Sequence, residues 1–154
     1  MKIYLQRHGA AIERDIAQAK AISDADRPLT AKGREKSLEI LAWFKQQGIS
    51  FDAMIVSPYR RAVQTGEILK PSLKGPVHTG VVELIPSAPV QSFAQWLKTL
   101  NKNYTSILVI GHEPMLSSFA SWLLAGSVVS FIDLKKSGCI CLEIESLGDL
   151  SARG

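Results

Sequence analysis

Three short apolar runs, each followed at once by a polar or glycine-containing turn, constrain this chain more than any other feature. They are KIYLQ before RHG, DAMIV before SPYRR, and SILVI before GHEP. Runs rich in Ile, Val and Leu that are bounded by turn residues are typical of strands buried on both faces of a parallel sheet. The pattern therefore predicts an α/β fold.

Segments with helical periodicity fill the intervals between these runs. Thr30 is expected to cap a helix that runs to about Gln47, with Leu38, Leu41 and Ala42 on one face. The alternation CICLEIE predicts a last strand toward one edge of the sheet. Two later stripes at helical spacing are assigned to the core: Phe93, Trp96, Leu97 and Leu100, and then Leu116, Phe119, Ala120, Leu123 and Leu124.

The length of the chain favours one domain. A chain of 154 residues with 46% hydrophobic content can bury one compact core but is short for two. We therefore expect a single three-layer domain over residues 1–154, with a mostly parallel central sheet, helices on both faces, and a polar tail from about residue 147 to 154. Residues 10–28 and 71–92 lack periodicity and are expected to be long loops, which are often functional.

Charge and hydropathy limit the classes of partner that the chain is expected to bind. The net charge is +4, but the basic residues are scattered, so nucleic-acid binding is not indicated. No apolar run approaches the roughly 18 residues of a membrane helix, and the N-terminal apolar stretch is too short for a signal peptide. We expect a cytoplasmic monomer without a membrane or nucleic-acid partner.

The two cysteines, Cys139 and Cys141, are spaced so that both thiols lie on one face of a strand. Two thiols are too few for a structural zinc site, which needs about four ligands. Both are therefore expected to be reduced and buried, and no metal site is predicted.

Basic side chains follow all three predicted strands. If the strands are parallel neighbours, Arg7 and His8, residues 57–61, and Gly111 and His112 emerge at the same edge of the sheet, where ligands of open α/β sheets bind. Such a cluster repels itself unless an anion is bound, and the planar fork of arginine suits a phosphate. The sequence therefore predicts a phosphate site.

The second of these turns strengthens the expectation. Ser57 is expected to be an N-cap and Pro58 the first helical residue, which places Arg60 and Arg61 in the first helical turn. The helix dipole disfavours positive charge there. We infer that a phosphate completes the site, with Ser57 among the residues that bind it.

The two histidines are expected to play different roles. A neutral imidazole can attack phosphorus, and nearby arginines would lower the pKa of His8 and keep it unprotonated. Gly9 would let the backbone pass close to the phosphoryl group, and a backbone carbonyl could hold the other ring nitrogen. His112 is expected to donate to the phosphoryl oxygens. The third histidine, His78, is assigned to the surface.

The same segments resemble a known family. RHG after the first strand, SPYRRAVQT after the second and GHEP after a later one resemble the histidine phosphatase superfamily, which has the phosphoglycerate-mutase-like fold. The resemblance covers nearly the whole chain. The short length, the RHGxA start and the RPLTxxG segment are similar to the small bacterial phosphohistidine phosphatases of the SixA type.

This resemblance implies roles for individual residues. His8 would be phosphorylated transiently, while Arg7, Arg61 and His112 bind the phosphoryl group. Arg61 matches the motif arginine because it directly precedes Ala62. Two weaker matches are Glu83, which falls where larger members carry an acidic proton donor, and Arg27, which could reach the rim of the site. The alternative for Glu83 is an ordinary surface glutamate.

The implied activity is removal of phosphate from a phosphorylated histidine on a protein, such as a phosphotransfer domain, through phospho-His8 and with inorganic phosphate as product. No metal or other cofactor is implied. In larger members of the superfamily, RHG is often followed by side chains that bind phosphate, whereas residues 10–12 here are Ala, Ala and Ile. This difference argues against a mutase or bisphosphatase. Two alternatives are a general phosphatase for small phosphomonoesters and a non-catalytic module that binds phosphoproteins.

Overall fold

A five-stranded sheet forms the centre of the molecule in the computed structural model, which describes residues 1–100, 102–148 and 150–151. The strand order is β3-β2-β4-β1-β5, and only β5, at one edge, runs antiparallel to its neighbour. The mostly parallel sheet and the edge position of the last strand confirm two predictions. The strands are β1 (Lys2–Arg7), β2 (Ala53–Val56), β3 (Val77–His78), β4 (Ser106–Gly111) and β5 (Cys139–Glu143).

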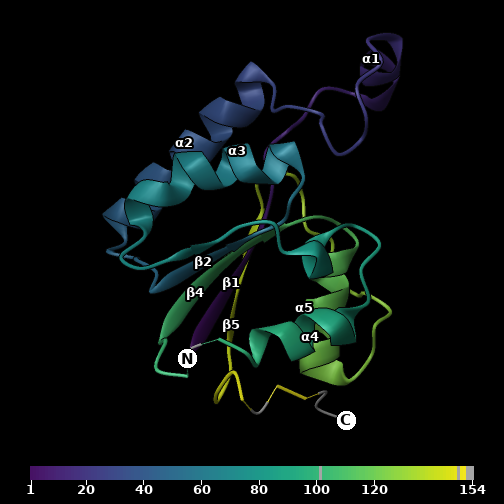
Figure 1. Ribbon diagram of the computed structural model, residues 1–154. Helices are drawn as coiled ribbons and strands as arrows, with labels where there is room; N and C mark the ends of the chain where they lie inside the picture. Colours follow the sequence, from purple (N-terminus) through teal and green to yellow (C-terminus); the bar gives the residue numbers. More distant parts are fainter. Residues whose placement is uncertain (101, 149, 152–154) are drawn as a thin grey trace.

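Helices cover both faces of this sheet, which gives the three layers expected (Figure 1). Helices α2 and α3 lie on one face, over a core that includes Phe44 and Phe51. Helices α4 and α5 lie on the other face, over a core that includes Phe93 and Phe119. The helices are α1 (Arg14–Ala19), α2 (Ala31–Gln46), α3 (Arg60–Leu69), α4 (Val90–Leu97) and α5 (Met115–Ala125), with short 3-10 helices η1 (Lys70–Ser72) and η2 (Val82–Leu84).

Helix α2 begins as predicted but buries a different face. The Thr30 hydroxyl accepts a hydrogen bond from the Gly33 amide at 3.0 Å, so Thr30 is the N-cap. The buried positions are Gly33, Ser37, Leu41 and Phe44, whereas Leu38 is 56% exposed and Ala42 is also exposed. Small residues at the start of this face let the helix approach the loop after β1 closely there.

The loop after β1 packs directly on the backbone of α2. A Cβ atom on Gly33 would lie 2.1 Å from the Ala10 carbonyl oxygen, and one on Gly9 would lie 2.7 Å from the Gly33 carbonyl oxygen. The amide and hydroxyl of Thr30 both donate to the Ala10 carbonyl. Gly9 was expected to make room for a phosphoryl group, but the contact that excludes a side chain there is with α2. The RPLTAKG segment therefore holds the RHG loop in place.

The segments expected to be plain loops contain short elements. Residues 10–28 include α1, and residues 71–92 include β3 and η2. His78 lies in β3 and is half-buried against Trp96, with ring centroids 5.9 Å apart, so its assignment to the surface was wrong. These short helices and this strand were not predicted, because each is too short to show a hydrophobic period.

Most predicted core residues are buried, with exceptions at the ends of elements. Phe93, Leu97 and Leu100 are buried, but Leu124 is 52% exposed at the end of α5. In the segment expected to be a polar tail, Leu147 and Leu150 pack into the core, while positions 149 and 152–154 lie outside the described residues.

The cysteines are free thiols, and neither is fully buried. Cys139 is half-buried and Cys141 is exposed, which corrects the expectation that both lie in the core. Both belong to the antiparallel edge strand β5, and an edge strand leaves more of its side chains in contact with solvent. In the described part of the chain, no helix is long and apolar enough to span a membrane.

Candidate active site

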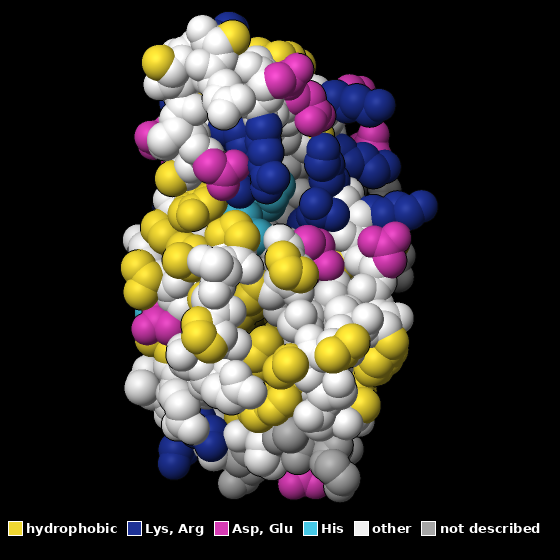
Figure 2. Space-filling view, turned by 90° about the vertical axis from the view of Figure 1, so that its right-hand side faces the viewer, with side chains coloured by type: hydrophobic (Ala, Val, Ile, Leu, Met, Phe, Trp, Pro, Cys, Tyr) yellow, Lys and Arg dark blue, Asp and Glu magenta, His cyan; other side chains and the backbone are white. Residues whose placement is uncertain are grey.

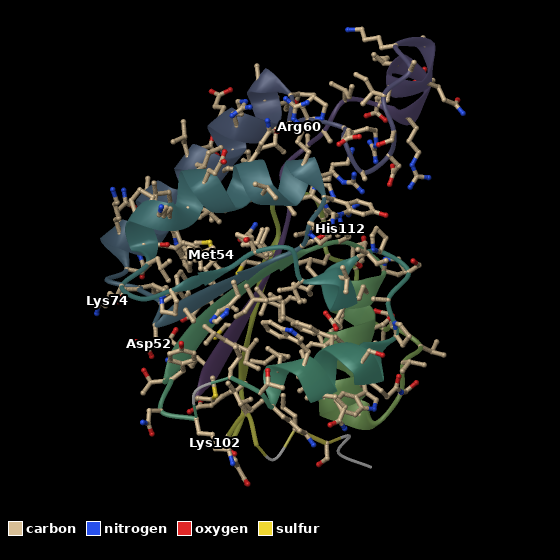
Figure 3. The ribbon with its side chains drawn as sticks, viewed as in Figure 1. Asp52, Met54, Arg60, Lys74, Lys102 and His112 are labelled. Carbon is tan, nitrogen blue, oxygen red and sulfur yellow. The ribbon has the colours of Figure 1, made fainter. Side chains whose placement is uncertain are left out.

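The register of the sheet brings the three predicted strand ends together. Arg7 at the end of β1 is paired with Gly111 at the end of β4, and Val56 at the end of β2 is paired with Ile110. His8, Ser57 and His112, which follow these strands, therefore emerge at one edge of the sheet. In Figure 3, His112 lies at this edge, between the two layers of helices.

A cavity of about 410 Å³ opens at this edge. Figure 2 shows Lys and Arg side chains gathered around histidine in the hollow. The residues that line the cavity are Arg7, His8, Ala11, Glu13, Arg14, Asp15, Arg27, Arg61, Pro86, His112, Glu113 and Lys136. Five of the predicted site residues thus meet in one cavity, whereas Ser57 and Glu83 do not line it.

His8 is held in one tautomer. Its Nδ1 atom lies 2.6 Å from the Gly9 carbonyl oxygen, which can only accept a hydrogen bond, so Nδ1 carries the proton. Its Nε2 atom accepts a hydrogen bond of 3.1 Å from Nε of Arg61. Nε2 is therefore unprotonated, and its lone pair accepts from the arginine that the sequence assigns to the phosphoryl group.

Both imidazoles of the cavity are neutral near pH 7. Burial lowers the pKa of His8 to about 3, and the charges of Arg61 and Arg7 add to this effect. Burial also lowers the pKa of His112 to about 2, together with His8 and Arg61. The arginines were expected to keep His8 unprotonated, but burial is the larger cause.

Ser57 supports His112 rather than capping a helix. Its hydroxyl is fully buried and lies 2.7 Å from Nε2 of His112. Helix α3 begins only at Arg60, with Tyr59 as its N-cap, which corrects the predicted helix start. The Ser57 oxygen also accepts a hydrogen bond from the Tyr59 amide at 3.4 Å, so its own proton is free to be donated to His112.

This arrangement leaves two buried donors without a partner among the described residues. If Ser57 donates to Nε2 of His112, the proton of His112 lies on Nδ1, which is buried and has no partner among the described residues. The Nε atom of Arg7 is also buried without a partner in that set, while its Nη1 atom donates to the Leu134 carbonyl at 2.8 Å. Oxygens of a bound phosphoryl group would satisfy both donors.

Arg61 is anchored by a residue that sequence reasoning missed. It is 2% exposed, and its Nη1 atom donates to the Asp24 carbonyl at 2.6 Å, while Nη2 lies 3.4 Å from the Asp24 carboxylate. The same carboxylate lies 2.9 Å from Nε of Arg27. Burial would raise the pKa of Asp24, but Arg61 and Arg27 outweigh it and hold the pKa below its usual range. Arg60, by contrast, is exposed and lies away from His112 (Figure 3).

The last two residues of SPYRRAVQT join α3 to neighbouring loops. The Thr65 hydroxyl accepts from the Gly9 amide at 3.1 Å and donates to the Arg61 carbonyl at 2.8 Å. The Gln64 side chain accepts from the Leu29 amide at 2.7 Å. Thr65 could have been noticed from its spacing, because it lies one helical turn after Arg61.

Glu83, the carboxylate that the resemblance implied as a proton donor, does not line the cavity. Glu83 lies in η2 and is half-buried, and the segment that follows η2 reaches the cavity only at Pro86. Glu113, directly after His112, does line the cavity. Among the described residues, no group of three or more His, Cys, Asp or Glu could hold a metal ion.

Comparison with known proteins identifies the family. The profile of the histidine phosphatase superfamily (branch 1) matches residues 3–80, which include the RHG and SPYRRAVQT segments. The chain belongs to the histidine phosphatase superfamily. As a member of that superfamily with this site, it is a phosphatase.

Individual superfamily members are similar over most of their length. Phosphohistidine phosphatase SixA of Escherichia coli (strain K12) is 32% identical over 149 residues, covering 90% of this chain and 88% of that protein. A structure of the protein histidine phosphatase SixA complexed with tungstate has a TM-score of 0.71 at 29% identity, covering 96% of this chain and 97% of the other. The alpha-ribazole phosphatase from Shigella flexneri shares the fold, with a TM-score of 0.69 at 19% identity and coverage of 94% and 91%.

The two histidines of this superfamily site should make the protein less stable in mild acid. Their pKa values of about 3 and about 2 in the folded chain lie below the ordinary 6.5, so the unfolded chain binds protons first as the pH falls. The stability present above about pH 6.5 is therefore lost between that pH and the folded values. Urea unfolding at several pH values should show this loss, and His112→Gln should make it smaller. If the free energy of unfolding changed equally with pH in both proteins, the assigned neutral state of His112 would be contradicted.

Proposed function

We propose that this phosphatase removes the phosphoryl group from a phosphorylated histidine on a protein, in two steps through phospho-His8. The observation that carries the proposal is the fixed tautomer of His8, with an unprotonated Nε2 facing a basic cavity. The similarity to phosphohistidine phosphatase SixA over most of the chain supports the choice of substrate.

In the first step, Nε2 of His8 attacks phosphorus in line with the bond to the substrate nitrogen. A bond forms between phosphorus and Nε2 as the bond to the substrate imidazole breaks, and the bonding electron pair leaves with that imidazole. Arg61 now donates to Nε2 of His8, so its Nε–H must turn to a phosphoryl oxygen as the lone pair engages phosphorus. In the second step, water attacks phospho-His8, which releases inorganic phosphate and restores the imidazole.

Three donors stabilise the charge on the equatorial oxygens. They are the guanidinium groups of Arg7 and Arg61 and the Nδ1–H of His112, which Ser57 orients. Removing one donor that is held in place in a buried site costs about 3 kcal/mol of transition-state stabilisation. These residues therefore act on phosphorus whatever the leaving group is, and they do not by themselves choose the substrate.

The second candidate is a phosphatase for small phosphomonoesters, because an alpha-ribazole phosphatase shares the fold. A panel of a phosphorylated phosphotransfer domain, p-nitrophenyl phosphate and sugar phosphates separates the two. We expect kcat/KM for the phosphorylated domain to exceed that for the sugar phosphates by about 100-fold or more. A preference for a sugar phosphate would favour the second candidate. Phosphate binding without turnover would indicate a non-catalytic module.

A further inference from the structure

Glu113 is an unexpected group in a phosphate site. It follows His112 directly and lines the same cavity as His8 and Arg61. Its carboxylate accepts hydrogen bonds from the amide of Ser117, at 3.1 Å, and from the Ser117 hydroxyl. Ser117 is buried in the first turns of α5, so the carboxylate is held on a rigid element. A carboxylate near a phosphoryl dianion repels it, so its presence calls for another partner.

Glu113 has no cationic partner although cations line the cavity. Among the described residues, the ion pairs around the cavity join Glu13 to Lys136 and Asp24 to its neighbouring arginines. The only hydrogen bonds of the Glu113 side chain within that part of the chain are the two from Ser117. A carboxylate offers about four acceptor positions, so two remain for a ligand. The site therefore presents an oriented acceptor beside its phosphoryl cradle.

Phosphohistidine differs from a phosphate ester in a way that matches this acceptor. Its ring has a second nitrogen, and when that nitrogen is protonated the imidazole can leave as a neutral molecule once the bond to phosphorus breaks. No further proton transfer is then needed. A carboxylate beside the N–H stabilises this protonated form, because a nearby opposite charge favours the charged state of a base. An ester has no such N–H group.

We propose that Glu113 accepts a hydrogen bond from the ring N–H of the substrate's phosphorylated imidazole and thereby selects phosphohistidine over phosphate esters. This inference rests on the proposed function and names the residue that recognises the leaving imidazole. In the transfer step the bond between phosphorus and the substrate nitrogen breaks, its electron pair stays on that nitrogen, and Glu113 keeps its hydrogen bond to the neutral imidazole.

The test compares substrates in Glu113→Gln. Glutamine keeps a carbonyl that can accept from Ser117 and removes the charge that faces the substrate. Charge-assisted hydrogen bonds contribute more than neutral ones, and we expect kcat/KM for a phosphohistidine peptide to fall by about 10- to 100-fold. Hydrolysis of p-nitrophenyl phosphate, whose leaving group needs no proton, should change by less than about 3-fold.

Asp15→Asn is the charge-matched control, because Asp15 also lines the cavity but lies on the exposed helix α1. This variant should leave the ratio of the two substrates unaltered. Equal losses on both substrates in Glu113→Gln, or a larger loss on esters than on phosphohistidine, would overturn the inference. Trapping of phospho-His8 in the wild-type protein is measured alongside these assays. A trapped phosphoenzyme would support the proposed function even if Glu113→Gln showed no substrate preference.

Discussion

The variant His8→Ala should lose at least about 10⁴-fold in kcat/KM toward phosphohistidine, as expected when a covalent nucleophile is removed. The Nε2 atom of His8 forms the new bond to phosphorus, once the Nε–H of Arg61 has turned from it to a phosphoryl oxygen. His112 is not expected to replace it, because Ser57 donates to its Nε2 atom and its Nδ1 atom then carries a proton and has no lone pair for attack. The measurement is steady-state hydrolysis of a phosphohistidine peptide.

A histidine outside the cavity provides the control for this variant. His78 lies in β3 against Trp96 and does not line the cavity. Because its side chain lies outside the cavity, His78→Gln should keep kcat/KM within about 3-fold of the wild-type value. Full activity in His8→Ala would show that the phosphoryl group does not pass through position 8.

Arg61→Ala should lower kcat/KM by about 10³-fold. The guanidinium donates hydrogen bonds to three groups: Nε2 of His8, the Asp24 backbone carbonyl and the Asp24 carboxylate. Its loss removes a donor to the phosphoryl oxygens and also frees His8 and the loop that carries Asp24. Lysine cannot reproduce this planar fork, so Arg61→Lys should recover little of the activity.

The neighbouring arginine is a matched control for this variant. Arg60 has the same chemistry and the same helix, but it is exposed and outside the cavity. Arg60→Ala should change kcat/KM by less than about 3-fold. Equal losses for the two alanine variants would mean that general positive charge, rather than the geometry of Arg61, binds the phosphoryl group.

The strand ends could be predicted from the sequence because two simple rules apply to them. Buried parallel strands read as apolar runs, and the carboxyl ends of parallel strands meet at one edge. Arg7, His8 and His112 directly follow such runs, so their convergence required no knowledge of the loops. Arg61 required one more step, the choice between two adjacent arginines.

Contacts made by the loops could not be predicted in this way. Asp24 reaches Arg61 from a segment without hydrophobic periodicity, and Ser57 bonds to His112 instead of capping α3. Glu83 does not line the cavity, whereas Glu113, which sequence reasoning did not single out, does. In each case the deciding factor is a three-dimensional path of the backbone that local spacing does not encode.

The buried face of α2 shows the same limit for packing. Hydrophobicity selects Leu38, but the close approach of Gly33 to Ala10 decides which side of the helix faces the sheet, and Leu38 is left exposed. The residue that sets the geometry is therefore a glycine, which carries no hydrophobic signal.

Mapping the phosphoenzyme tests the central claim most directly. The wild-type protein is mixed with a radiolabelled phosphohistidine donor, quenched in alkali within one turnover, digested and sequenced by mass spectrometry. We expect one acid-labile, alkali-stable phosphoryl group on the peptide that contains His8, and none in His8→Ala. A label on His112 or on a hydroxyl residue, or turnover without any trapped label, would contradict attack by Nε2 of His8.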